Sequence, residues 1–407
     1  MFLPEREYSL EESFNSILNI FNIHRWTVSN EYNPLGFGNQ LDVATEIQND
    51  ESRLLKSYTE SRGKGKGLES LCSANYELLE HIIYENPQLQ SFELSDTQND
   101  EKIEGDIVIE IQNYLPKFKN IRFSKLGAQS IFGYLPGYYC GFSTSDDVNN
   151  PYARLIECYY SNNGWAAGAN YYEALLHALN ELLERDSVSN AYISIINNKE
   201  FGCEYQNLSP ELSKLKESIE QRKHHDVHLI HLDSLAGHSF IAFCENNFGY
   251  KTIGCGSSLY PEYAARRALS ELWQELVADS LTNSAEEKLR KKRLEHILTN
   301  YPNLSKAIKL EGNFSSSKEE LFSTCTQNRA PKEQVEKIIN DLSTKSIDCW
   351  ARTIFSEQSE NCIPTVVQVV APGLERFHRI HDGLIVEPIG RLRTHTNINL
   401  ARKKYNS

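Results

Sequence analysis

Three segments that lie far apart in the sequence carry polar, mostly acidic side chains at the same spacing of i, i+4 and i+7. At about 100° per residue, these offsets fall within roughly 60° of one another, so each trio forms a narrow stripe on one face of a helix. The rest of each helix is strongly apolar, which predicts three helices buried on most sides. The trios are Ser73/Glu77/Glu80, His177/Glu181/Glu184 and Arg267/Glu271/Gln274.

Three stripes of this kind that face one another would concentrate four or more carboxylates in one cleft. Like charges at that density require metal ions to hold them together. An ordinary amphipathic surface helix also pairs an apolar face with a charged one, and it is the commoner explanation for any single helix. A solvated face usually mixes charge signs, because Glu and Lys four residues apart stabilise a helix. These stripes contain no lysine, which favours a shared acidic cleft.

Two of the stripes follow glycine-rich loops. The first loop, Gly63–Gly67, reads Gly-Lys-Gly-Lys-Gly, and the second, Ser161–Gly168, reads Ser-Asn-Asn-Gly-Trp-Ala-Ala-Gly. Glycines let backbone N–H groups approach a phosphate, and Lys64 adds positive charge. The first loop lacks the G-x-x-x-x-G-K-[ST] pattern of a Walker loop. Alone it is equally compatible with a flexible turn.

Taken in order, these motifs resemble the YcaO family, and they match the azoline-forming peptide cyclodehydratases best. The resemblance spans roughly residues 20 to 390 and includes Val369–Glu375, which is similar to the late strand and turn of the family. It implies an α/β (α+β) fold in which mixed sheets and packed helices surround a central ATP cleft. The motifs are Gly63–Lys66, Ser73–Glu80, Asn163–Ala174, Glu181–Asp186 and Arg267–Gln274.

The resemblance also implies ATP and Mg²⁺ as cofactors. By motif position, the nucleotide would be contacted by Arg25, Lys64, Ser73, Glu77, Asn163, Arg267 and Glu271. The Mg²⁺ ligands would be Glu77, Glu80, Glu181 and Glu184. His177 stands where many relatives carry glutamine. Azoline-forming members often end in a proline-rich tail near the active site, whereas this chain ends Arg402–Ser407, so the catalytic base is unassigned.

The reaction implied by the resemblance starts when a Cys, Ser or Thr side chain attacks the preceding backbone carbonyl of a peptide. ATP phosphorylates the resulting oxyanion, and phosphate leaves to give a thiazoline or oxazoline. We expect a ribosomal precursor peptide as substrate and a separate leader-binding partner protein, because the chain has no room for a further leader-binding domain. A flavin-dependent azoline dehydrogenase and a homodimer are further associations that the family suggests.

Two alternatives to ring formation stay open at this point. The same activated amide can be attacked by external sulfide or by an internal amine, which gives a thioamide or an amidine. The chain can also be a nucleotide-binding scaffold that has lost catalysis and docks substrate for a partner. Retention of all the acidic motif positions argues against the scaffold.

Composition limits the remaining classes of function. The chain has 407 residues and a formal net charge of −13 at pH 7, which disfavours nucleic acid as the main partner. No signal sequence is visible, and no apolar run approaches the roughly 18 residues of a membrane span. Nine cysteines without a C-x-x-C pair argue against a disulfide framework and a zinc site. We therefore expect a cytoplasmic protein without a membrane segment.

We expect one elaborated α/β domain rather than several. Residues 1–60 would form its N-terminal portion, 61–280 the core with the ATP and Mg²⁺ motifs, and 281–407 a helical and strand portion that completes it. Periodicity predicts a helix over 7–22, a strand over 106–112, paired strands over 227–232 and 239–244, and peripheral helices over 280–345. A histidine cluster is interpreted as strand and loop residues rather than a metal site; its members are His224, His225, His228 and His231.

Overall fold

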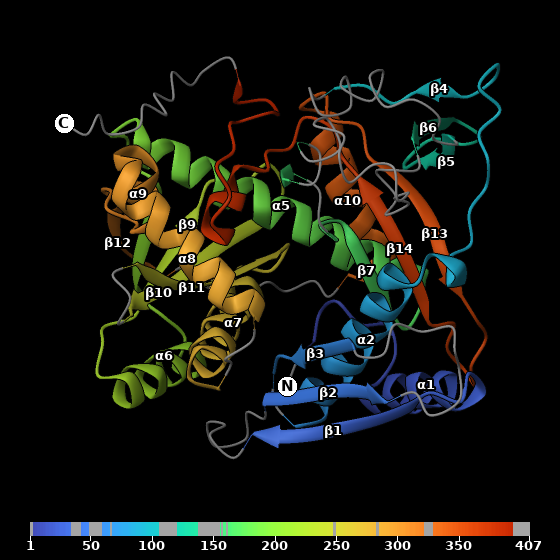
Figure 1. Cartoon of the computed structure of the whole chain (residues 1–407), viewed down its shortest axis with the longest axis horizontal. Helices are drawn as coiled ribbons and strands as arrows, with labels where there is room; N and C mark the ends of the chain where they lie inside the picture. The colour runs from blue at the N-terminus through green and yellow to red at the C-terminus, as the bar shows by residue number, and fades with distance from the viewer. Residues whose placement is uncertain are drawn as a thin grey trace.

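The computed structural model describes most of the chain, and the predicted strand over 106–112 lies outside the described residues. The described residues are 3–33, 42–48, 59–65, 67–105, 120–136, 155, 158–159, 162–246, 250–281, 285–320 and 329–393. They form a mixed α/β structure with three sheets (Figure 1). None of the described helices is long and apolar enough to cross a bilayer.

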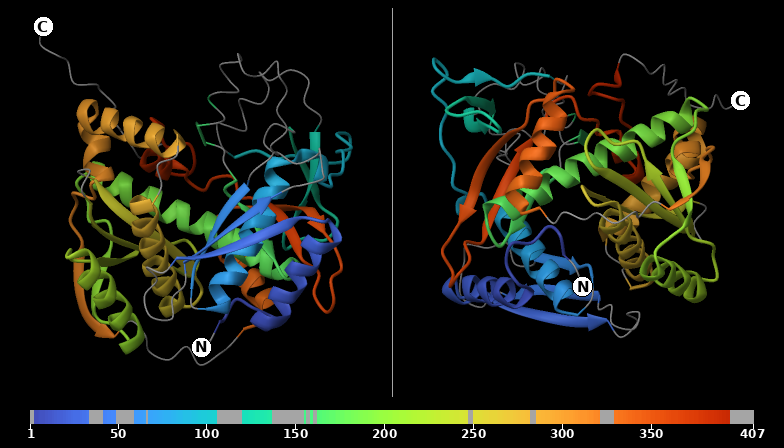
Figure 2. Two further views of the ribbon diagram at one scale, coloured as in Figure 1. Left: turned by 60° about the horizontal axis from the view of Figure 1, so that its bottom comes forward. Right: turned by 180° about the vertical axis from the view of Figure 1, so that it is seen from behind.

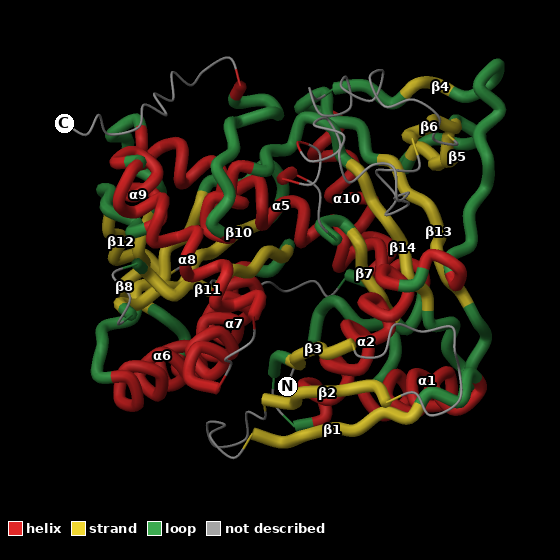
Figure 3. Tube along the Cα trace, in the orientation of Figure 1, coloured by secondary structure: helices red, strands yellow, loops and turns green. Residues whose placement is uncertain are grey.

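The smallest sheet has the order β1-β2-β3, is antiparallel throughout, and lies beside α1 and α2 (Figure 3). The helix predicted over 7–22 begins at Leu10 instead. Ser9 and Glu12 form a capping box, and the backbone N–H groups just before it donate to the carboxylate of Glu173, so they do not enter the helix. The bounds are β1 Thr27–Asn33, β2 Asp42–Gln48, β3 Thr59–Gly63, α1 Leu10–Ile23 and α2 Leu68–Glu85.

The largest sheet has the order β4-β6-β5-β13-β14-β7 and is antiparallel except for the parallel pair β4·β6. After β14 the chain turns at Gly373, with φ of 99°, as expected for the late strand and turn. The bounds are β4 Glu101–Lys102, β5 Asn120–Lys125, β6 Phe132–Pro136, β7 Trp165–Gly168, β13 Trp350–Ser356, β14 Thr365–Val370 and the 3₁₀ turn η1 Pro87–Leu89.

The five-stranded sheet has the order β11-β10-β9-β8-β12, with only β8·β12 parallel. The predicted strand pair is confirmed as β9 and β10, and His228 and His231 lie on β9. Its bounds and those of its helices are β8 Cys203–Asn207, β9 His228–Leu232, β10 His238–Glu245, β11 Lys251–Ser258, β12 Ser315–Glu320, α6 Pro210–Lys223, α7 Pro261–Leu281, α8 Ala285–Asn300, α9 Pro302–Ile308 and the 3₁₀ helix η5 Phe377–Asp382.

The segment 280–345 is not only helical and not only peripheral. It contains the strand β12 as well as α8, α9 and α10 (Pro331–Ser343). Val335, Ile338 and Leu342 of α10 are buried in one cluster with the first half of α5. Helical periodicity therefore identified α10 but not the surface that it covers.

Helix α5 (Tyr171–Ile196) joins the two larger sheets. Its first half packs on β7, β14 and α10, and its second half packs on β10, α9 and η5. The view from behind in Figure 2 shows α5 running from the six-stranded sheet to the five-stranded sheet. Its middle, which carries the predicted acidic stripe, therefore lies where the two halves of the molecule meet.

Each stripe-bearing helix follows directly after a strand, and two glycines allow unusually close packing between strand and helix. A Cβ on Gly63 at the end of β3 would lie 1.8 Å from the carbonyl oxygen of Ser70 in α2. A Cβ on Gly254 in β11 would lie 2.0 Å from the backbone nitrogen of Leu272 in α7. Any side chain at these positions would push the helix away. The glycines thus fix the distance of the polar stripes from their sheets.

Candidate active site

The first two polar stripes and Arg267 of the third line one cavity of about 280 Å³, whereas Glu271 and Gln274 of the third stripe do not. Its walls come from α2, α5, α7, the loops before α2 and α5, and the N-terminal segment that includes Glu5 and Arg6. The predicted site residues that line it are Lys64, Ser73, Glu77, Glu80, Glu181, Glu184 and Arg267, together with His177. The expectation that the stripes face a common space is therefore met for the first two stripes and, in the third, for Arg267 alone.

Four of the carboxylates that line the cavity, named here the acidic wall, are Glu77 and Glu80 on α2 with Glu181 and Glu184 on α5. Glu80 is 7% exposed and Glu184 is 3% exposed. Burial, followed by the neighbouring charges of Glu181 and Glu77, raises the pKa of Glu80 well above its usual range. Burial also raises the pKa of Glu181 to about 7, with Arg185 opposing the shift. These carboxylates therefore carry repulsion that a cation would relieve.

Four cations that line the same cavity, named here the basic wall, are Arg6, Lys64, Arg266 and Arg267. Arg266 donates two hydrogen bonds to the carboxylate of Glu69, at 2.9 and 2.6 Å. Nη1 of Arg267 lies 3.3 Å from Oε2 of Glu5, while its buried Nε has no hydrogen-bond partner among the described residues. A buried donor without a partner is the kind of group that a ligand oxygen satisfies. The basic wall is thus suited to an anion.

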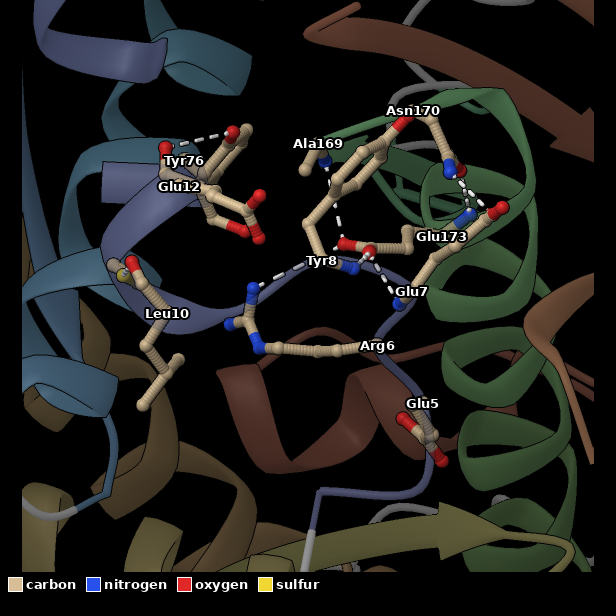
Figure 4. A network of polar contacts seen from close by, with 12 residues as sticks. Glu5, Arg6, Glu7, Tyr8, Leu10, Glu12, Tyr76, Ala169, Asn170 and Glu173 are labelled. Atoms are coloured by element: carbon tan, nitrogen blue, oxygen red, sulfur yellow. Dashed lines mark hydrogen bonds and ion pairs between the residues drawn. The ribbon is translucent and has the colours of Figure 1, made fainter. Parts of the chain in front are cut away.

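The N-terminal segment forms part of this wall (Figure 4). The carboxylate of Glu173 accepts hydrogen bonds from the backbone N–H of Glu7 at 2.7 Å and of Tyr8 at 3.3 Å. Nη1 of Arg6 lies 3.9 Å from Oε2 of the same side chain. Glu173 therefore anchors the segment at the start of α5 and places Arg6 at the cavity.

Lys64 and Glu271 form an ion pair between the first glycine-rich loop and α7. Although burial disfavours its charge, Lys64 and Arg185 hold the pKa of Glu271 below its usual value. Glu271 lines a neighbouring cavity rather than this one, and Arg185 lines both. Glu271 therefore reaches the first cavity only through its ion pair with Lys64, and its nucleotide contact stays a prediction.

His177 replaces the glutamine of many relatives without adding charge. His177 is exposed to the cavity, and desolvation by the cavity walls and then the charges of Arg267, Lys64 and Arg6 lower the pKa of His177 well below its usual value. Its imidazole is therefore neutral at pH 7 and offers hydrogen-bonding groups, as an amide does. The departure from the family pattern keeps the polarity of the position.

Besides Glu271, two more predicted residues do not line the cavity. Arg25 is exposed at the end of α1, with φ of 55°. Asn163 is half-buried, and its neighbour Asn162 lines the cavity instead and donates to Oε1 of Glu80 at 3.0 Å. Sequence reasoning missed Arg6, Asn162 and Arg185. Arg185 lies inside the quoted Glu181–Asp186 motif, so a signal for it existed, whereas nothing local distinguishes Arg6.

The acidic wall has the chemistry of a Mg²⁺ site that is completed by its ligand. Carboxylate oxygens are the protein ligands that Mg²⁺ prefers, and this ion commonly uses one or two carboxylates with substrate phosphates. Among the described residues, no three His, Cys, Asp or Glu side chains already converge on one metal position. Glu77, Glu80, Glu181 and Glu184 would therefore hold Mg²⁺ together with phosphate oxygens rather than as a closed cage.

The fold agrees with solved structures at low sequence identity. The chain is similar to YcaO from Methanopyrus kandleri bound with AMPPCP and Mg²⁺, with a TM-score of 0.68 and 18% identity over 94% of this chain and 96% of that one. It is similar to a heterocyclase in complex with substrate and cofactor, with a TM-score of 0.62 and 17% identity over 91% of this chain and 53% of that one. The E. coli microcin synthetase McbBCD complex gives a TM-score of 0.52 and 13% identity over 85% and 88%.

No match to this chain was found among curated protein sequences. The family model for the YcaO cyclodehydratases, which are described as ATP- and Mg²⁺-binding, matches residues 63–375. This match covers the glycine-rich loops, the acidic wall and the late strand and turn, and it gives ATP and Mg²⁺ as the cofactors. The chain belongs to the YcaO family.

Proposed function

We propose that this protein is an ATP-dependent peptide cyclodehydratase that forms thiazoline or oxazoline rings from Cys, Ser or Thr residues. One observation carries the proposal. A single cavity is lined by seven carboxylates, including the four of the acidic wall, and by five cations, including the four of the basic wall. A magnesium nucleotide matches both walls, because its metal requires oxygen ligands and its phosphates require cations.

The proposed reaction balances without any other co-reactant. The thiol or hydroxyl attacks the preceding carbonyl carbon, the new C–S or C–O bond forms, the carbonyl π electrons move to oxygen, and a base takes the proton of the nucleophile. The oxyanion then attacks the γ-phosphorus of ATP and displaces ADP. Finally, the amide nitrogen expels phosphate and loses its proton, which leaves the C=N bond of the azoline.

The residues of the cavity have defined tasks in this scheme. Lys64, Arg6 and Arg267 bind and orient the phosphates, and Asn162, Ala167 and Gly168 of the second glycine-rich loop line the same cavity. Positioning of this kind supplies most of the catalysis in phosphoryl transfer. Bound Mg²⁺ supplies charge neutralisation at the phosphates.

We further propose that the substrate is a ribosomal precursor peptide and that a separate leader-binding protein delivers it in the cytoplasm. The McbBCD complex, which shares the fold, is an assembly of several components. A protein that works with a delivery partner should hydrolyse ATP slowly alone, because no nucleophile is held at the γ-phosphate.

The test is a reconstituted reaction with ATP, Mg²⁺, the precursor peptide and the leader-binding protein from a neighbouring reading frame. Each ring lowers the peptide mass by one water and releases one phosphate. The Glu184→Ala variant should lose both signals together, whereas Glu217→Ala, an exposed carboxylate on α6, should keep both.

Other outcomes overturn the proposal in distinguishable ways. Equal mass loss with wild type and Glu184→Ala indicates a scaffold for another enzyme. Exchange of one oxygen for sulfur indicates thioamide formation. A mass loss of one water in which an amine of the peptide has attacked the amide, with every Cys, Ser and Thr side chain unchanged, indicates an amidine.

A further inference from the structure

A second cavity of about 170 Å³ lies beside the first, between α5, β11, α7, α8 and η5. The two cavities meet at Arg185, which lines both. Arg185 is held from the first cavity by Glu184 at 3.8 Å and Glu181 at 3.9 Å. Glu271 lines the second cavity and forms the ion pair with Lys64 of the first. A ligand in the second cavity would therefore lie next to the phosphate-binding groups.

Three buried polar atoms around this cavity have no hydrogen-bond partner among the described residues. They are Oη of Tyr192, Nδ1 of His378 and Nδ1 of His381. Tyr192 is fully buried, and His378 is 8% exposed. Buried polar atoms in native proteins are almost always satisfied by protein, water or ligand. Ordered water or a ligand with several hydrogen-bonding groups would satisfy these three atoms, which belong to residues that line one cavity.

The aromatic rings hold these groups in fixed positions. The rings of Tyr192 and His381 are stacked with centroids 6.5 Å apart, and Tyr250 meets His381 edge-on at 6.2 Å. The backbone N–H of His378 donates to Oγ of Ser189 on α5 at 2.8 Å. The three polar atoms are thus set by the packing of η5 against α5 rather than by mobile side chains.

All three unpartnered groups are neutral near pH 7. Burial and then Arg185 lower the pKa of His378 well below its usual value, and burial and then Arg290 lower the pKa of His381 to about 4. Burial raises the pKa of Tyr192 well above its usual value. Charged residues of both signs line the rest, with Arg185 and Arg290 opposite Glu271, Glu275 and Asp382. A neutral ligand that both donates and accepts hydrogen bonds suits these groups better than an anion does.

We propose that the second cavity binds the main-chain amide of the peptide residue that is modified, and that it presents the carbonyl oxygen of this amide to the nucleotide past Arg185. This inference rests on the proposed function. An amide supplies one acceptor and one donor, which match the neutral tyrosine and imidazole groups. The volume suits a single residue rather than a longer segment, so one amide is selected at a time.

The first experiment uses N-acetylglycyl-cysteine amide as the probe and ADP with Mg²⁺ to fill the first cavity. Saturation-transfer NMR should detect bound probe in the wild-type protein even when ADP is saturating. Tyr192→Phe removes one hydroxyl, and His378→Gln keeps a neutral polar side chain of another shape. Each should weaken probe binding by at least about fivefold, the loss expected for one neutral hydrogen bond. ADP affinity should stay within about twofold, which also verifies folding.

The matched control is Tyr205→Phe, a hydroxyl deletion on β8 that lines neither cavity. It should bind the probe as the wild type does. Probe binding that ADP abolishes, or that both variants leave unchanged, overturns the inference. Equal binding of N-acetylglycine, which carries a carboxylate, overturns the assignment to a neutral amide. If one variant does not fold, the other decides.

Failure of this inference and failure of the proposed function give different results. Ring formation by Tyr192→Phe and His378→Gln at the wild-type KM for peptide overturns the amide site and leaves the cyclodehydratase standing. If probe binding depends on both residues but no ring forms in the reconstituted reaction, the amide site is supported and the proposed ring formation is overturned.

Discussion

The acidic and basic walls of the first cavity both hold charges that are partly withdrawn from solvent, yet these charges are compensated differently in the two walls. Each cation of the basic wall already has a carboxylate from the protein: Arg266 has Glu69, Arg267 has Glu5, Lys64 has Glu271 and Arg6 has Glu173. In the acidic wall, Arg185 lies beside Glu181 and Glu184, at 3.9 and 3.8 Å, and His81 lies 4.0 Å from Glu77. The basic wall is therefore preorganised, whereas the charge state of the acidic wall depends on what binds there.

The largest expected effect is the loss of a carboxylate from the acidic wall. Glu80→Ala and Glu184→Ala should each weaken binding of Mg²⁺ with ATP by about 2–3 kcal/mol, or roughly a hundredfold, because the ligand loses a buried charged partner. Calorimetry with Mg²⁺ and ATP measures this directly. Wild-type affinity in both variants would contradict the assignment of the acidic wall to the metal.

The second prediction uses pH to separate the walls without nucleotide. Burial raises the pKa of Glu80 and Glu181 in the folded protein, the latter to about 7. A raised pKa means that their contribution to stability is fully present below about pH 4.5 and is lost as pH rises through about 7. In EDTA, the free energy of unfolding should therefore fall by about 1–3 kcal/mol between pH 5 and pH 8.

The control for this pH effect is Glu181→Gln, which removes one of the two titrating groups and should make the profile less steep. Mg²⁺ with ADP should restore the stability of the wild type at pH 8, because only the folded protein binds the ligand. Denaturant unfolding at each pH measures both effects. Identical profiles for wild type and Glu181→Gln would show that this carboxylate titrates normally.

The acidic wall could be predicted from sequence, and the reason is geometric. A helical period places residues four and seven apart on one face whatever the tertiary structure, so the carboxylates were found without knowing what they face. Lys64 was predicted as a phosphate contact because it is a cation among the glycines of the first loop. The resemblance to the family then supplied the expectation that the three helices meet.

The remaining site residues depend on contacts that no local pattern records. Arg6 reaches the cavity only because Glu173, more than 160 residues later, binds the backbone of its segment. The second cavity combines α5 with η5 and β11, again from distant parts of the chain. Strand β12 was missed because its sequence, Ser-Ser-Ser-Lys-Glu-Glu, is polar and lies at a sheet edge, where alternation of apolar residues is not required.

The third prediction tests the basic wall at its loop. Lys64→Ala should weaken ATP binding by about tenfold, because one phosphate contact is lost. The free energy of unfolding should fall by less than about 1 kcal/mol, because Arg185 remains as a cation close to Glu271 after Lys64 is removed. Calorimetry and denaturant unfolding of Lys64→Ala, Glu271→Gln and the double variant give the coupling between the two side chains. If Lys64→Ala unfolds, or if it keeps full ATP affinity, the loop has a structural role and Lys64 does not bind phosphate.

The smallest expected effect is a gain in affinity at the N-terminal segment. The carboxylate of Glu5 lies 3.3 Å from Nη1 of Arg267 and is 8% exposed, so it occupies a contact that a phosphate would use. Burial raises the pKa of Glu5 even though Arg267 opposes the shift, which shows that its charge is only partly compensated. Glu5→Gln should therefore strengthen ATP binding by about two- to fivefold, as the removal of one competing charge predicts.

The control is Glu7→Gln, which removes a charge from the same segment. Glu7 does not line the cavity, so this variant should leave ATP affinity unchanged. Weaker binding in Glu5→Gln would mean that Glu5 orients Arg267 for the nucleotide, and the basic wall would then need all of its carboxylate partners to function.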